Sequence, residues 1–391
     1  MARRTVLRYW GSHFKSLEHA ERIASYFAAP RQAGWDCHLV TSRAPASAAW
    51  LAPLQRDGIT IHHVERARGN FDTRCVVAAR RLCRAIGADV MHCDNTHTSP
   101  LIGAALARVP VRIWTKHAMQ PAFEQVRPPT WRERLAPAVR TSAAIATMIL
   151  PISGAISEEL AALGIPRSKL QVLPLPAAPV MAPVSSAGSA RRQWALEPEH
   201  LVFGAVGRAI PVKAWDVLME AFAATHQRFP QSRLLLVGST DGDDERQFRA
   251  RLDAIARRHG IGEAIVFTGH VTNVGEAFDA MDVFVLPSRA EGFSLALIEA
   301  LAAGLPVVST RVGIAPDIVT NGEQGLLVSR GDGDSLRGAL MTLAADPALR
   351  ARLAAAAPAA VRALPSHHEH SRLLLEIYES LFNRRERSTA S

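Results

Sequence analysis

Short apolar runs alternate with longer amphipathic segments along most of the chain. The runs are rich in Val, Ile and Leu, as is typical of buried strands. In the segments between them apolar positions recur at helical spacing. Regular alternation of this kind indicates parallel strands joined by crossover helices, so the sequence predicts an α/β fold.

The first series of these elements occupies residues 1–173. Its expected strands are Thr5–Trp10, Cys37–Thr41, Ile59–Val64, Ala88–Cys93, Val111–Thr115 and Met148–Ser153. Its expected helices are Leu17–Ala28, Thr73–Ile86, Pro100–Ala107 and Glu158–Leu163. We therefore expect this part of the chain to form one doubly wound domain.

A shift in composition separates this series from a second one. From Pro174 to Ser189 the chain is mostly Pro, Ala, Ser and Gly, which favours a linker over 174–190. The second series occupies residues 191–365. Its expected strands are Leu201–Val206, Arg233–Val237, Ile265–Thr268, Val283–Leu286 and Val307–Thr310. Its expected helices are Ala214–Phe229, Asp244–His259, Glu276–Met281 and Ser294–Ala303.

The last expected helix, His367–Phe382, lies in the C-terminal segment 366–391, after the second series is complete. We expect it to pack across the hinge between the two domains. Together the two series predict two doubly wound, Rossmann-like domains with an interdomain cleft.

The stretch after the run Val283–Leu286 combines a strand end, a polar loop and a helix start. Ligands of open α/β sheets bind at the carboxyl ends of the strands. At the expected helix start the backbone N–H groups of Ser294 and Leu295 lack intrahelical partners and can bind an anion. Glu291 and Glu299 add two carboxylates. This combination suits a ligand with hydroxyls at both ends and phosphates between them, such as a nucleotide-sugar.

A loop with two cations follows the first strand of the second series. It reads Gly-Arg-Ala-Ile-Pro-Val-Lys over residues 207–213. The guanidinium of Arg208 and the ammonium of Lys213 can together hold a diphosphate. They would also stabilise the negative charge that develops on a departing nucleotide diphosphate.

Both loops resemble segments of the retaining glycosyltransferases of the GT-B fold, family 4, also called group 1 glycosyl transferases. The E-x7-E segment of that family matches Glu291 and Glu299, and its G-R-x-x-x-x-K segment matches Gly207 to Lys213. The resemblance implies that Glu291 contacts the donor sugar and Glu299 the ribose hydroxyls. It assigns the diphosphate to Arg208 and Lys213.

The resemblance also implies roles for residues around these loops. His117 would touch the donor sugar or help the acceptor lose its proton, so it joins Glu291, Arg208 and Lys213 as a catalytic candidate. His270 and Val271 would meet the base. The other donor-binding candidates are Gly238, Gly292, Phe293, Ser294 and Leu295. Three polar residues past the strand ending near Cys93 would meet the acceptor: Asp94, Asn95 and His97.

Charge is unevenly distributed. The chain carries +9, but residues 1–180 hold 23 Lys and Arg against 12 Asp and Glu, a net +11, and the remainder is −2. A basic half attracts anions such as a membrane surface or a phosphorylated substrate. The cluster around Trp131 predicts peripheral membrane attachment and a lipid-linked acceptor. That cluster consists of Arg127, Arg132, Arg134 and Arg140. The competing interpretation is a soluble enzyme whose arginines are merely solvated.

Other features of the sequence narrow the compartment and the chemistry. No run is long and apolar enough to span a bilayer, and no secretory signal follows the basic start, so we expect a cytoplasmic protein. The four cysteines form no C-x-x-C pair, which favours reduced thiols and no zinc. We expect no cofactor and no metal.

These observations predict transfer of a sugar from a nucleotide-sugar to an acceptor hydroxyl in polysaccharide or glycolipid assembly. The resemblance implies that the transfer retains the anomeric configuration. Two alternatives remain. A nucleotide-sugar epimerase of the same fold would convert the donor without an acceptor. A non-catalytic basic protein would bind nucleic acid in a salt-sensitive way, although we expect no nucleic acid as partner.

Overall fold

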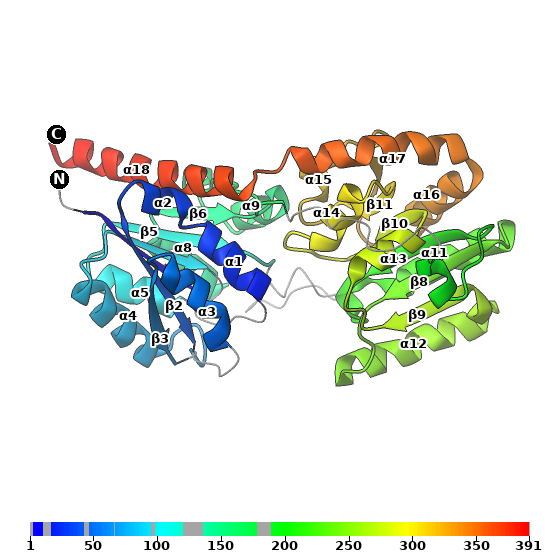
Figure 1. Cartoon of the computed structure of the whole chain (residues 1–391), viewed down its shortest axis with the longest axis horizontal. Coiled ribbons are helices and arrows are strands. Elements are labelled where there is room, and N and C mark those ends of the chain that lie inside the picture. The colour runs from blue at the N-terminus through cyan, green and yellow to red at the C-terminus, as the bar shows by residue number, and fades with distance from the viewer. Residues whose placement is uncertain are drawn as a thin grey trace. The chain divides into compact units, whose positions relative to one another are not determined.

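The apolar runs form the parallel strands of two sheets in the computed structural model (Figure 1). The structure describes residues 3–10, 17–42, 47–65, 67–94, 98–119, 136–177 and 189–390. Within these ranges the chain forms two units. The first contains the described residues up to 118, those from 136 to 176 and those from 365 onward, and the second is formed mainly by 189–364.

The sheet of the first unit has the order β3-β2-β1-β4-β5-β6 in the described part of the chain, and all its strand pairs are parallel. This is the doubly wound order of a Rossmann-like domain. Its strands are β1 (Thr5–Tyr9), β2 (Asp36–Ser42), β3 (Thr60–Val64), β4 (Val90–Asp94), β5 (Val111–Lys116) and β6 (Met148–Pro151). Its helices are α1 (Leu17–Ser25), α2 (Ala28–Gln32), α3 (Ser47–Arg56), α4 (Thr73–Ala85), α5 (Ser99–Leu106), α8 (Pro137–Ile145), α9 (Gly154–Ala162) and α18 (His367–Ala390).

The sheet of the second unit has the matching order β12-β11-β10-β7-β8-β9, again all parallel. Its strands are β7 (Leu201–Val206), β8 (Ser232–Val237), β9 (Ile265–Gly269), β10 (Val283–Leu286), β11 (Val307–Thr310) and β12 (Gly325–Val328). Its helices are α10 (Ser189–Gln193), α11 (Trp215–Arg228), α12 (Asp243–His259), α13 (Val274–Ala280), α14 (Leu295–Ala302), α15 (Ala315–Ile318), α16 (Gly333–Ala345) and α17 (Pro347–Arg362). The predicted α/β class with two doubly wound domains is confirmed.

Several elements differ from the expected ones. The helix expected over Leu17–Ala28 stops at Ser25, and α2 begins afresh at Ala28. Pro30 accounts for the break, because a proline has no N–H to continue an existing helical ladder but is tolerated in a first turn. The second sheet was expected to end at Thr310, but β12 adds a further strand beside β11. Helices α3, α16 and α17 were also missed.

Helix α18 packs on the first unit, where it contacts α1, α2 and β5 (Figure 1). It begins with a capping box, in which Ser366 and Glu369 bond each other's backbone N–H at 3.2 and 2.8 Å. Tyr378 is 1% exposed, and its hydroxyl lies 2.6 Å from Nδ1 of His92 on β4. The structure assigns α18 to the first unit, and the predicted linker 174–190 lies mostly outside the described residues.

Two buried histidines at this contact predict acid-sensitive stability. Burial, and then the charge of Arg8, lowers the pKa of His92 well below its ordinary value and that of His370 to about 3. Both histidines titrate near 6.5 in an unfolded chain, so their stability contribution is complete above pH 6.5 and is lost as pH falls from there toward 3. Each one costs up to about 1.4 kcal/mol of unfolding free energy per pH unit. We expect the urea concentration at the midpoint of unfolding to decrease as the pH is lowered from 7 to 4.5.

The variant His370→Asn keeps a donor for the carbonyl of Pro174, which lies 2.9 Å from Nδ1 of His370, and should flatten this pH dependence. The exposed neighbour His368→Gln serves as the control and should leave the slope unchanged. An unaltered slope in His370→Asn would show that this histidine is not buried and neutral in the folded chain.

Candidate functional site

Three glycines bring neighbouring strand ends together in the second unit. Gly207 and Gly238 directly follow β7 and β8, and Gly269 is the last residue of β9. The N–H of Gly238 donates to the carbonyl of Gly269 at 3.0 Å. Gly238 has a φ of +143°, and a Cβ there would lie 1.7 Å from the carbonyl oxygen of Gly207. Only glycine allows two backbones to approach this closely. This close approach at Gly238 therefore fixes where the cation-bearing loop begins.

Lys213 and Glu291 meet at this edge of the sheet. The ammonium Nζ of Lys213 lies 2.7 Å from Oε1 of Glu291, and the hydroxyl of Ser288 donates to the same oxygen at 2.7 Å. The side chains of Lys213 and Glu291 are 24% and 11% exposed. A Cβ on Gly313 would lie 2.9 Å from the Cβ of Glu291, so backbone packs directly behind the carboxylate. Two residues predicted from separate loops thus form one ion pair that faces partly into solvent.

Arg289 connects the loop that contains Glu291 with the loop that contains Lys213. Its backbone N–H donates to the carbonyl of Val212 at 2.8 Å, and its guanidinium holds both oxygens of Asp216 at 3.1 and 2.9 Å. Asp216 is 3% exposed and lies in the first turn of α11. Neither residue was predicted to serve the site. Arg289 could have been noticed as a charged residue three positions after a buried strand.

Arg208 faces a different carboxylate. Its guanidinium is 68% exposed and lies 3.4 Å from Oε1 of Glu245 on α12. Of the two predicted diphosphate ligands, Lys213 is therefore held by the glutamate loop and Arg208 by α12.

The start of α14 carries backbone strain. Ser294 precedes the helix with a φ of +75°, in the left-handed region, and its side chain makes no capping hydrogen bond. Such a conformation costs a residue other than glycine about 1–3 kcal/mol and is typical of functional sites. The first backbone N–H groups of the helix, including that of the 38% exposed Leu295, therefore have no capping side chain from Ser294.

The remaining donor candidates lie around this edge. Gly292 and Phe293 precede Ser294 in the glutamate loop, and the carbonyl of Phe293 accepts from Ile314 at 3.2 Å. Glu299 is half-buried in α14. His270 and Val271 follow β9, with His270 exposed and Val271 half-buried.

In the first unit a buried carboxylate holds His117. Asp94 ends β4 with its side chain fully buried, and Arg8 of β1 binds both of its oxygens, one of them at 2.7 Å. Nε2 of His117 lies 3.0 Å from Oδ1 of the same carboxylate. Burial by itself would raise the pKa of Asp94, but Arg8, His92 and His117 hold it well below its usual range. Asp94 is therefore an ionised acceptor that orients His117.

Of the three residues predicted to meet the acceptor, the structure describes only Asp94. Asp94 is enclosed by Arg8 and His117, whereas Asn95 and His97 lie outside the described residues. His117 is 18% exposed at its side chain, and the ring of Trp10 packs edge-on against it with centroids 5.8 Å apart. Arg8 was missed, although a charged residue inside the apolar run of β1 could have indicated it.

The described residues contain no group of three or more His, Cys, Asp or Glu side chains placed to hold a metal ion. In the same residues no helix has the length and apolar character needed to cross a bilayer. The four cysteines are free and buried, as expected.

Two family descriptions match most of the chain. Residues 18–177 match Glycosyltransferase Family 4, and residues 200–346 match Glycosyl transferases group 1. The two matches divide between the first and second units and agree with the family indicated by the loop motifs.

Curated relatives match over part of their length. A D-inositol 3-phosphate glycosyltransferase of Stackebrandtia nassauensis is 38% identical over 43% of this chain and 39% of its own. The lipopolysaccharide core biosynthesis mannosyltransferase LpsB of Rhizobium meliloti is 31% identical over 49% of this chain and 55% of its own. The chain thus spans about two fifths to a little over half of these relatives.

Among solved structures, Anabaena HepE in complex with UDP has a TM-score of 0.76 at 18% identity, covering 96% of this chain and all of its own. HepE has also been solved with UDP and glucose and with UDP-glucose. At this identity the likeness shows the fold, and it confirms the GT-B architecture.

The close contact at Gly238 predicts that the same substitution, glycine to alanine, has opposite effects on stability at two positions. We expect Gly238→Ala to lower the unfolding free energy by about 3 kcal/mol or more, because a methyl group would overlap the backbone of Gly207. The matched control is Gly338→Ala on the exposed face of α16, which should stabilise by about 0.5–1 kcal/mol. Urea unfolding of both variants measures this, and a neutral Gly238→Ala would contradict the close approach.

Proposed function

Because the chain belongs to glycosyltransferase family 4, with the GT-B fold, we propose that it transfers a sugar from a nucleotide-sugar to an acceptor hydroxyl with retention of anomeric configuration. The observation that carries the proposal is the Lys213–Glu291 ion pair beside the strained start of α14. It combines a cation for phosphate, a carboxylate for sugar hydroxyls and backbone N–H groups for an anion at one sheet edge.

Lys213 has a role that changes when the donor binds. Without donor, the charge of Lys213 is balanced by one carboxylate, that of Glu291. A diphosphate brings two or more negative charges and competes for the ammonium, which frees Glu291 to accept hydrogen bonds from the sugar. As the bond to the sugar breaks, Lys213, Arg208 and the N–H groups at the start of α14 stabilise the charge on the leaving diphosphate. We propose that these groups serve without a divalent metal.

His117 would act on the sugar or on the acceptor. Its Nε2 faces the ionised Asp94, which favours the tautomer with the proton on Nε2. Nδ1 then carries a lone pair that can accept a hydrogen bond from a hydroxyl. Arg8 keeps Asp94 charged and fixed, so it positions His117 without touching the substrate.

The relatives suggest the setting of the reaction. LpsB is named for lipopolysaccharide core biosynthesis. We propose that this chain likewise acts in polysaccharide or glycolipid assembly, on a lipid-linked acceptor at the cytoplasmic face of a membrane. The described surface supports attachment there, because α4 contains four arginines and no acidic residue. Val77 on this helix and Phe71 just before it are 46% and 51% exposed.

Calorimetry against a panel of uridine, guanosine and adenosine diphosphate sugars tests the proposal, followed by an assay of diphosphate release with and without acceptor glycans. We expect one donor to bind and to be consumed faster when acceptor is present. Conversion of the donor into its epimer without acceptor would instead support an epimerase. The absence of binding by any nucleotide-sugar would reject the proposed function.

We expect Lys213→Ala to lower turnover by about 10²-fold or more, as loss of an electrostatic stabiliser typically does.

Glu299→Ala should weaken the affinity for both nucleotide and nucleotide-sugar, because Glu299 would hold the ribose. Glu291→Ala should lower transfer but leave nucleotide diphosphate affinity equal or higher, since it releases Lys213. The exposed Arg246→Ala serves as control, and equal loss of diphosphate affinity in both glutamate variants would show that the assigned roles are wrong.

Flotation with anionic vesicles at low and high salt tests membrane attachment. We expect co-flotation at low salt that is lost at high salt, because each basic residue near an anionic surface contributes about 1 kcal/mol. Changing Arg80, Arg81 and Arg84 of α4 to Ser, or Arg132, Arg134 and Arg140 to Ser, should reduce it. As a control, the three exposed arginines Arg246, Arg257 and Arg337 of the second unit are changed to Ser, which should not reduce co-flotation. If the protein does not float with the vesicles at low salt, the alternative of a soluble enzyme with solvated arginines is favoured.

A further inference from the structure

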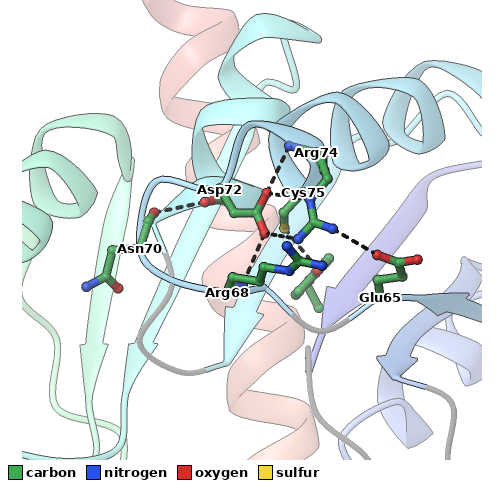
Figure 2. Close-up of polar contacts among 8 residues, drawn as sticks. Glu65, Arg68, Asn70, Asp72, Arg74 and Cys75 are labelled. Atoms are coloured by element: carbon green, nitrogen blue, oxygen red, sulfur yellow. Dashed lines mark hydrogen bonds and ion pairs between the residues drawn. The ribbon is translucent and has the colours of Figure 1, made fainter.

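The first unit contains a pocket that the proposed chemistry has not used. It has a volume of about 290 Å³ and lies where β3 ends and α4 begins. Its polar lining consists of His63, Glu65, Asp72, Arg74 and Cys75; Figure 2 shows the last four of these residues and their polar contacts. This volume is at the small end of the range of ligand sites, about 300–1,000 Å³, and suits a single ring rather than a nucleotide.

The guanidinium of Arg74 is fixed between two carboxylates. Nη2 and Nε of Arg74 donate to Asp72 at 2.9 and 3.2 Å, and Nη1 donates to Oε2 of Glu65 at 3.2 Å (Figure 2). Asp72 also accepts the backbone N–H groups of Arg68 and Arg74, each at 3.0 Å, and caps α4. The side-chain hydrogen bond from Arg74 is the main cause that holds the pKa of Asp72 below its usual range.

This arrangement determines which ligands the pocket accepts. The lining holds two carboxylates against one guanidinium, so a phosphate or carboxylate would meet net negative charge and would have to displace both partners of Arg74. A neutral hydroxyl group has no such conflict, because it can donate to a carboxylate and accept from an N–H. Glu65 is 86% exposed at its side chain, so it can bind such a hydroxyl.

The pocket lies on the same sheet edge as His117. All strands of this sheet are parallel, so the ends of β3, β1, β4 and β5 share one edge. Tyr9, the last residue of β1, reaches the pocket lining, since its hydroxyl lies 3.2 Å from Sγ of Cys75. The next residue, Trp10, packs against the ring of His117. Two consecutive residues therefore connect the pocket with the histidine proposed to face the reacting groups.

We propose that this pocket binds the acceptor, and that the ring it holds is a neutral sugar or polyol without phosphate or carboxylate. The inference rests on the proposed function, which requires an acceptor. It adds the chemical class of that acceptor. Glu65 and Arg74 hold the ring hydroxyls, and Asp72 holds Arg74.

Saturation-transfer NMR on the full chain tests the pocket with matched pairs of probes. The neutral probes are the methyl α-D-pyranosides of glucose, galactose and mannose together with myo-inositol, and the anionic ones are glucose 6-phosphate and glucuronic acid. We expect at least one neutral ring to bind, and each anion to bind at least about tenfold more weakly. Absence of binding by every neutral ring, or equal binding of the anions, would overturn the proposal.

Variants locate the binding. Glu65→Gln and Arg74→Gln should each raise the Kd of the neutral ring about tenfold or more, and the backbone cap from Asp72 remains in both. The control Arg56→Gln removes an exposed arginine at the end of α3, outside the pocket, and should leave the Kd unchanged. An unchanged Kd in both pocket variants would place the ring elsewhere and reject the inference.

The two proposals fail in different ways. UDP, GDP and ADP are tested in the same samples, and their affinity should not change in the Glu65 and Arg74 variants. If a nucleotide binds but no neutral ring does, the acceptor inference is wrong and the donor site stands. If a neutral ring binds at Glu65 and Arg74 but no nucleotide or nucleotide-sugar binds, the proposed function is wrong.

Discussion

Both sheets are parallel, and their central strands are buried on both faces, which determines where polar groups can lie. In β10 every residue from Val283 to Leu286 is at most 2% exposed, as expected for a strand covered by helices on each side. Charged side chains within such strands require a partner, because an unpaired buried charge is strongly unfavourable. Polar groups that act on ligands are therefore concentrated at the carboxyl edge of each sheet, where the strands end and loops begin. Lys213 and Glu291 lie at that edge in one unit, and His117 and Arg74 in the other.

The buried pair of Arg8 and Asp94 shows what an exception requires. The Arg8 and Asp94 side chains are 3% and 0% exposed, and removing one partner of such a pair typically costs about 3–5 kcal/mol. Well-packed apolar residues often stabilise a fold as well as a buried ion pair does, so stability alone does not account for it. The carboxylate has a further partner in His117, and Arg8 keeps that carboxylate ionised. The pair therefore has a consequence at the sheet edge, because its carboxylate is held where it can bond Nε2 of His117 and orient the ring.

Local patterns in the sequence predicted most strands and drew attention to the two loops assigned to the donor, but they did not predict the contacts between distant segments. The strands from Val283 and Val307 have the expected bounds because their apolar runs end in polar loops. Strand β12 was missed because it is half-exposed at its centre, so its apolar pattern is weaker than that of the equally short β10 and β11. Helix α17 contains many alanines and shows little contrast between its faces. Arg289 and Asp216 are 73 residues apart, and Arg8 and Asp94 are 86 apart, so no spacing rule connects them.

Comparison of the two cations explains why one edge suits a diphosphate and the other does not. Lys213 has one carboxylate partner, and its ammonium is a point charge on a flexible stem, so a dianionic ligand can compete with Glu291 for it. Arg74 has two carboxylate partners, and Asp72 binds its planar guanidinium through two donors. A ligand phosphate would have to break both ion pairs and would then lie between two carboxylates. The number of carboxylates around each cation, more than the cation itself, thus distinguishes the proposed phosphate site from the proposed hydroxyl site.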